Sequence, residues 1–312
     1  MKSPSIINYE IRPCKFTERR ILLSSLLAIT NRLNIEYQYI GFGGLAFTDF
    51  KLFHKELGIN TMYSIEACYS GEKIAFNKPY SCINVLHYKS TEALLKIDLT
   101  RPSIVWLDYD GELTMDAFTD ISILFNQLPE GSIYILTCNR QLINEEADPQ
   151  RPYTNEEFEN VFKELVPYNI EKNCCSEVNS HRTIKSMVDA YCERILRDRN
   201  KLQDRLFHYK PLYNFRYHEQ GGAKMFTTGG IIIGDDIPEA VINQCHTEFI
   251  GDDVIDISIP NLTRRESLCL NQIMNNEALE RDIIQKSIIK EKDIDNYKKF
   301  YKYMPNFYDV RL

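Results

Sequence analysis

Short apolar runs alternate with helical patterns through the first half of the sequence. Five runs rich in β-branched and aromatic residues are separated by segments that can form helices. Strands that alternate with helices predict crossover connections and a parallel sheet with helices on both faces. Strands buried on both faces read as continuous apolar runs, as the fourth and fifth runs do. The five predicted strands are residues 37–42, 61–66, 81–87, 103–108 and 132–137.

Longer helical patterns lie on either side of these strands. Apolar residues at three- and four-residue spacing predict a helix over residues 17–33, with Thr17 as its cap. A polar stretch at 139–181 reads as an insertion with its own helix at 154–165. A further amphipathic pattern predicts a helix over 183–207.

The second half of the sequence predicts a β-hairpin and then helices. Two β-rich runs, 211–219 and 223–234, are joined by a short glycine-rich turn. Near the C-terminus, Thr263 and Glu266 have the spacing of a capping box at the start of a helix. We therefore expect an α/β fold with a mostly parallel sheet, a terminal antiparallel hairpin and a small C-terminal helical appendage. The expected divisions are an N-terminal helical segment (1–36), an α/β domain (37–255) and a C-terminal helical region (256–312).

The composition is that of a globular protein, and it limits the compartments and partners to be expected. Of the 312 residues, 44% are hydrophobic and 26% are charged, which is close to the averages for globular proteins. No apolar run reaches the roughly 20 residues that span a bilayer. Nine scattered cysteines and no Cys-x-x-Cys spacing fit a reducing compartment, and we expect a cytoplasmic protein without a zinc site. The net charge of −7 argues against nucleic-acid binding over the whole surface, although a local basic groove remains open.

Three glycines follow the first predicted strand. Gly41, Gly43 and Gly44 lie where that strand gives way to a helix, and glycine permits a sharp turn and close approach of a ligand. Ligands of open α/β sheets bind at the carboxyl ends of the strands. Glu66 ends the second strand about 20 residues later, where an acid can accept hydrogen bonds from ribose hydroxyls. A tight turn and a solvated strand end are the alternatives to an adenosine-containing cofactor.

The arrangement over residues 37–234 resembles the class I S-adenosylmethionine-dependent methyltransferase family, which has a Rossmann-like fold. The resemblance implies a seven-stranded sheet with an antiparallel last strand, and S-adenosylmethionine as the cofactor. It further implies that the three glycines lie beside its methionine and ribose parts and that Glu66 holds the ribose. Residues 87–90, with His87 and Tyr88 as the cofactor-binding residues, would flank the adenine. The string G-F-G-G-L-A at 41–46 also satisfies a dinucleotide fingerprint, which would indicate NAD or FAD.

The candidate catalytic residues follow the fourth strand. Asp108 and Asp110 are expected in a turn loosened by Gly111, at the same sheet edge as the glycines. A carboxylate there could orient an acceptor or take its proton, and Tyr109 is assigned to acceptor binding. The alternatives are a polar turn that caps the next helix, or a divalent metal held by the two aspartates with Glu112.

Two basic segments bear on the acceptor. Arg12 and Lys15, with Arg19 and Arg20, either begin a solvated helix or attract an anionic substrate. The segment 208–219 mixes aromatic and basic residues, which suits either nucleotide stacking or a half-buried strand.

The sequence thus predicts a methyltransferase that acts on an unidentified acceptor. A nucleic acid or nucleotide is slightly favoured over a small molecule, and the acceptor would be chosen by the N-terminal segment, the insertion and the C-terminal helices. One alternative is a catalytically inactive binding or scaffold protein that contacts a partner through the C-terminal helices. The other is an NAD-dependent oxidoreductase.

Overall fold

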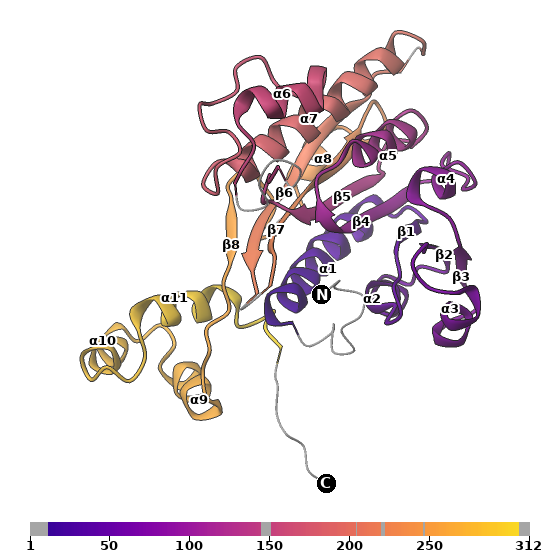
Figure 1. Cartoon of the computed structure of the whole chain (residues 1–312). Coiled ribbons are helices and arrows are strands. Elements are labelled where there is room, and N and C mark those ends of the chain that lie inside the picture. Colours follow the sequence, from indigo (N-terminus) through magenta and orange to yellow (C-terminus); the bar gives the residue numbers. More distant parts are fainter. Residues whose placement is uncertain (1–11, 145–150, 204, 220–221, 246, 306–312) are drawn as a thin grey trace.

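The computed structural model describes residues 12–144, 151–203, 205–219, 222–245 and 247–305. Its centre is an eight-stranded sheet in the order β3-β2-β1-β4-β5-β7-β6-β8 (Figure 1). The strands are β1 (Gln38–Phe42), β2 (Thr61–Ile65), β3 (Ile83–Leu86), β4 (Ser103–Glu112), β5 (Ile133–Asn139), β6 (His208–His218), β7 (Lys224–Ile233) and β8 (Ile255–Ile257).

The direction of β7 defines the topology. The five strands β1 to β5 run parallel to one another, whereas β7 is antiparallel to both of its neighbours, β5 and β6. The predicted hairpin is confirmed, and it places one antiparallel strand between two that run the same way. This arrangement agrees with the expected antiparallel strand of the methyltransferase resemblance.

Helices cover both faces of the sheet (Figure 1). Because side chains alternate along a strand, Val105 and Leu107 of β4 pack into one core, and Ile104 and Trp106 pack into the other. The first core includes side chains of α4 (Ser90–Leu94), α5 (Met115–Phe125), α6 (Asn155–Phe162) and α7 (Ser180–Asn200). The second includes side chains of α1 (Pro13–Leu33), α2 (Thr48–Leu57), α3 (Gly71–Asn77) and α8 (Glu239–Asn243).

Helix α1 is fastened to the sheet along its length. Proline begins the helix at Pro13, where a missing N–H costs nothing. No side chain of its own caps this end, but the backbone N–H of Lys15 donates to the Glu219 carboxylate at 2.9 Å. A carboxylate at this end satisfies an otherwise unpaired N–H and favours the helix dipole. Further along, Ser25 shares a hydrogen bond of 2.9 Å with the Tyr213 hydroxyl of β6.

Four features differ from the sequence predictions. Strand β8 adds an eighth strand parallel to β6, and its three residues are too few to form a visible pattern. Strand β4 continues to Glu112, so the candidate aspartates lie in an extended strand instead of the predicted turn. Helix α7 ends at Asn200 rather than at 207, and α1 begins at Pro13 rather than after Thr17.

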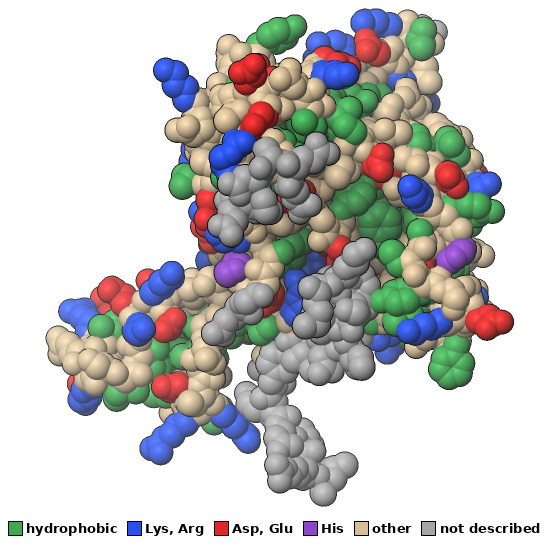
Figure 2. Space-filling view, viewed as in Figure 1, with side chains coloured by type: hydrophobic (Ala, Val, Ile, Leu, Met, Phe, Trp, Pro, Cys, Tyr) green, Lys and Arg blue, Asp and Glu red, His purple; other side chains and the backbone are tan. Residues whose placement is uncertain are grey.

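The C-terminal helices form a separate small layer. Helices α9 (Arg264–Ile273), α10 (Glu277–Gln285) and α11 (Glu291–Phe300) share a core of their own. The predicted capping box is present, with Thr263 and Glu266 bonded reciprocally at the start of α9. This region protrudes from the body and carries side chains of both charges on its surface (Figure 2). A protein partner for it remains a prediction, as do the domain boundaries. Residues 1–11 and 306–312 of the predicted terminal segments lie outside the described residues.

None of the helices that the structure describes could cross a membrane. The two longest, α1 and α7, carry charged residues along their length.

His181 is a buried titratable group in the first turn of α7. Its ring is 2% exposed and lies edge-on to Phe226 of β7, with 5.9 Å between the ring centroids. Burial, together with the charges of Arg216 and Arg140, lowers its pKa from 6.5 to about 4. The native protein therefore binds a proton at this site less readily than the unfolded chain does.

We expect His181 to make stability fall as the pH falls from about 6.5 to about 4, because the unfolded chain takes up the proton first. Above pH 6.5 this histidine is neutral in both states and the loss is absent. In urea titrations at pH 7 and pH 5, the wild type should lose about 1–2 kcal/mol more than His181→Leu does. Equal losses in the two proteins would contradict this role.

Candidate functional site

A cavity of about 870 Å³ opens at the carboxyl ends of β1, β2 and β4. Its walls come from the segments that follow β1, β2, β3 and β4, and from residues of helices α1 to α5. Seven of the predicted site residues line it: Gly43, Gly44, Glu66, Tyr88, Asp108, Tyr109 and Asp110.

The three glycines are required for different reasons: two have close neighbours, and the third has a left-handed backbone conformation. A Cβ on Gly41 would lie 2.9 Å from the Trp106 carbonyl and 2.6 Å from the Tyr39 hydroxyl, and Gly41 does not line the cavity. A Cβ on Gly43 would meet the Ser64 hydroxyl at 2.2 Å. Only Gly44 has open space around it, and its φ of +52° lies in the left-handed region. The protein's own atoms therefore require a glycine at position 41, and its predicted cofactor role stays a prediction.

The glycine turn ends at Phe47, the N-cap residue of α2, which has a strained backbone conformation. Phe47 is fully buried and has a φ of 49°, which is uncommon for a residue with a Cβ. Its N–H donates to the Gly43 carbonyl at 3.0 Å, and its ring packs edge-on against Phe50. Burial of the ring holds the backbone in this conformation and so fixes the shape of the glycine turn.

Glu66 is held in place at the end of β2. Its Oε1 accepts a hydrogen bond of 2.6 Å from the backbone N–H of Cys68, and the residue is 7% exposed. Strand β2 lies directly beside β1, so this carboxylate and the glycine turn share the cavity wall. The predicted pair of glycine turn and acid is thus brought together.

The segment after β3, predicted to flank the adenine over residues 87–90, contributes all but its first residue to the cavity lining. Tyr88 lines the cavity, and the Lys96 ammonium group lies over its ring, 4.6 Å from the ring centre. His87 is exposed and lies outside the cavity lining, so the structure does not support contact between its side chain and the cofactor. Its neighbours Lys89 and Ser90 do line the cavity.

Tyr109 presents its ring rather than its hydroxyl. The hydroxyl donates to Asp120 Oδ2 at 2.6 Å, and burial raises the pKa of both groups. The ring lies edge-on to Phe42, with centroids 5.2 Å apart, and both rings line the cavity. This residue offers an acceptor an apolar surface.

Asp108 is paired with α1 across the floor of the cavity. Its Oδ2 lies 2.8 Å from Lys15 Nζ, and the Asp108 side chain is 11% exposed. Lys15 also lies 2.9 Å from Glu18 Oε2 and is itself 1% exposed. The prediction that Lys15 binds an acceptor is therefore corrected, because its ammonium group is buried against protein carboxylates.

The rest of the basic N-terminal segment is divided between the interior and the surface. Arg19 lines the cavity and donates to Asp49 Oδ1 at 2.5 Å from a side chain that is 4% exposed. Arg12 precedes α1 and is outside the cavity lining. The sequence analysis gave Glu18 no site role and considered Arg19 only as part of a basic segment that could attract an anionic substrate. Their signal was a helical spacing that puts charged residues on the face turned toward the sheet.

The aromatic segment 208–219 belongs to β6. Its aromatic side chains are buried in the two cores, as a central strand requires. The strand interpretation is therefore confirmed, and these rings cannot stack on nucleotides in this structure. They are Tyr209, Tyr213, Phe215 and Tyr217.

The aspartates do not form a recognisable metal site. Within the described part of the chain, no group of three or more His, Cys, Asp or Glu residues is placed to hold a metal ion. The position beside Asp108 that a cation could take is occupied by the Lys15 ammonium.

Comparison with protein families gives one match, which covers almost the whole chain. Residues 7–312 match the family described as "Putative O-methyltransferase". No curated protein is similar in sequence. The match confirms the predicted methyltransferase resemblance and, with it, S-adenosylmethionine as the cofactor.

Several solved structures are similar at low identity. They include Trm1 from Pyrococcus horikoshii with S-adenosyl-L-methionine, at 9% identity, a TM-score of 0.44 and coverage of 69% of this chain and 55% of that one. Human N-acetylserotonin methyltransferase with the same ligand has 8% identity, a TM-score of 0.35 and coverage of 68% and 50%. The N-methyltransferase NodS from Bradyrhizobium japonicum with S-adenosyl-L-homocysteine has 10% identity, a TM-score of 0.38 and coverage of 72% and 90%. The chain spans about half the length of the first two.

We expect substitutions at Gly44 to cost stability through backbone conformation, and substitutions at Gly43 to cost stability through steric overlap. Gly44→Ala should lower the free energy of unfolding by about 1 kcal/mol, and Gly44→Asn by less, because asparagine tolerates the left-handed region. Gly43→Ala should cost about 1–3 kcal/mol through overpacking, and Gly43→Asn more. Urea unfolding of the four variants measures this order. The same ranking of alanine and asparagine at both positions would contradict it.

Proposed function

The chain belongs to this O-methyltransferase family, and we propose that it transfers a methyl group from S-adenosylmethionine to a hydroxyl oxygen of a small acceptor molecule. The observation that carries the proposal is the cavity at the carboxyl ends of β1 and β2, where an open glycine turn faces a fixed carboxylate. When bound, the cofactor supplies a methyl group activated by a sulfonium.

The residues of the cavity fit this cofactor. Gly44 leaves main chain exposed beside the cavity, and Glu66 offers carboxylate oxygens for ribose hydroxyls. The lining contains five carboxylates and three basic side chains, so its formal charge favours a cationic ligand group. The carboxylates are Asp49, Glu66, Asp108, Asp110 and Asp116, and the basic residues are Arg19, Lys73 and Lys89.

Asp108 is the residue best placed to act on the acceptor. It lies at the end of a central strand, and its carboxylate is both fixed by Lys15 and open to the cavity. Methyl transfer is an in-line displacement that depends on alignment of the attacking oxygen. Asp108 would accept a hydrogen bond from the acceptor hydroxyl, orient its lone pair and receive its proton.

The acceptor is proposed to be small for two reasons. The cavity volume lies within the range of about 300–1,000 Å³ that is typical of small-molecule sites. The two features that favoured a nucleic acid are used by the fold, because Lys15 and Arg19 are buried in ion pairs and segment 208–219 is a core strand. The excess of carboxylates in the cavity also disfavours a phosphate-rich acceptor.

Glu66→Ala is expected to weaken cofactor binding by about tenfold to a hundredfold, since hydrogen bonds to a charged group contribute about 1.5–3 kcal/mol. Calorimetry with S-adenosylhomocysteine measures the change. The control is Glu72→Ala, which removes an exposed carboxylate in the first turn of α3, outside this cavity. Binding that is equal in wild type and Glu66→Ala would refute the ribose assignment, and no binding to the wild type would refute the proposed function.

Asp108→Asn is expected to reduce methyl transfer by about 10²–10⁴-fold and to leave affinity for S-adenosylhomocysteine within about threefold. The assay follows a radiolabelled methyl group from the cofactor to a panel of phenols, catechols and aliphatic alcohols. The exposed Asp236→Asn serves as the control. Transfer to RNA or DNA oligonucleotides, and to no member of the panel, would contradict a small acceptor.

A further inference from the structure

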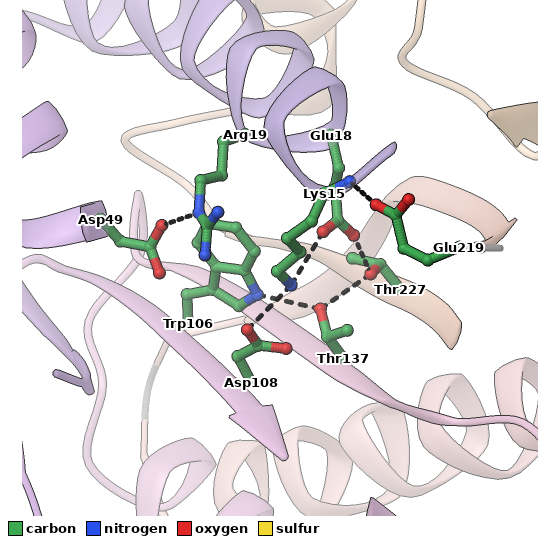
Figure 3. Close-up of polar contacts among 9 residues, drawn as sticks. All are labelled: Lys15, Glu18, Arg19, Asp49, Trp106, Asp108, Thr137, Glu219 and Thr227. Atoms are coloured by element: carbon green, nitrogen blue, oxygen red, sulfur yellow. Dashed lines mark hydrogen bonds and ion pairs between the residues drawn. The ribbon is translucent and has the colours of Figure 1, made fainter. Parts of the chain in front are cut away.

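A chain of buried hydrogen bonds crosses three strands and ends on α1 (Figure 3). The Trp106 indole N–H donates to Thr137 Oγ1 at 2.9 Å, and the hydroxyls of Thr137 and Thr227 lie 2.7 Å apart. Thr227 donates in turn to the Glu18 carboxylate. Because Thr227 uses its proton on Glu18, Thr137 must donate to Thr227, so every donor points the same way. Glu18 is therefore held as an acceptor at the end of the chain.

Lys15 links this chain to the cavity. Its ammonium group lies between Glu18 and Asp108, at 2.9 Å and 2.8 Å, and 4.7 Å from the centre of the Trp106 ring (Figure 3). Glu18 is completely buried, whereas Asp108 reaches the cavity. One ammonium group thus contacts two carboxylates, of which only one faces the ligand.

We infer that Lys15 is a positioning residue of this site: it fixes Asp108 and sets the charge that Asp108 presents to the cavity, while Glu18 sets how much of the Lys15 charge is left for Asp108. The inference rests on the proposed function, because it concerns the same cavity. Its physical basis is that Coulomb interactions are strong where water is excluded, so one buried charge changes the potential in the cavity.

The affinities of two ligands of nearly the same shape can be compared to measure the effect of this potential. S-adenosylmethionine carries a positive sulfonium, whereas S-adenosylhomocysteine lacks the transferred methyl group and has a neutral sulfur. A change that only disturbs the fold of the site weakens both. A change in the charge near the sulfur alters the ratio of the two dissociation constants.

The test is calorimetry of both ligands with the full chain and single variants. Lys15→Met removes the cation beside Asp108, so the preference for S-adenosylmethionine over S-adenosylhomocysteine should rise by about tenfold or more. Glu18→Gln leaves Lys15 and removes its competing carboxylate, so the same preference should fall. The opposite signs separate an electrostatic role from a structural one. Glu18→Gln also keeps the test open if Lys15→Met does not fold.

The matched control is Lys185→Met. It removes a lysine that likewise contacts two carboxylates, Asp189 at 2.5 Å and Asp252 at 3.4 Å, away from the cavity lining. Its ratio should stay within twofold of the wild type. Unchanged ratios in both Glu18→Gln and a folded Lys15→Met would overturn the inference while both ligands still bind the wild type. Failure of both ligands to bind the wild type would refute the proposed function instead.

Discussion

The ion pair between Lys15 and Asp108 joins the N-terminal helix to the end of the central strand, and the arrangement of the site depends on it. Removing one partner of a buried pair leaves the other charge uncompensated, at a cost of about 3–5 kcal/mol. The pair therefore tolerates only one position of α1 relative to the sheet. The contacts of α1 with Glu219 at one end and Tyr213 further along hold the helix in that position.

The opposite wall of the cavity depends on a backbone constraint instead. Phe47 holds a left-handed conformation because its ring is buried, and this fixes the turn that begins at Gly43. Glu66 is fixed by the N–H of Cys68. A ligand in the cavity therefore meets groups that are already in place, which lowers the entropy lost on binding.

Most of the fold could be predicted because its strands and helices are long enough to show their period. The parallel strands, the hairpin and the glycine–acid pair follow from that pattern. Strand β8 could not be predicted, because three residues show no periodicity. Lys15 was assigned to an acceptor and Gly41 to the cofactor for a common reason: a charged side chain and a glycine both suggest contact with a ligand. In the structure Lys15 pairs with Asp108, and Gly41 is close to Trp106, both of them distant in sequence. The extension of β4 past Asp108 was missed because its polar residues resemble a turn.

An N-terminal helix that precedes a sheet, as α1 does, is an obvious element to remove when a domain is truncated. Here it supplies the counterion of a site residue and covers apolar side chains of one sheet face. A fragment beginning at β1 would lack both, leaving a bare hydrophobic surface and a carboxylate without its lysine. A truncated form that keeps the cavity intact must therefore include α1 as well as the sheet.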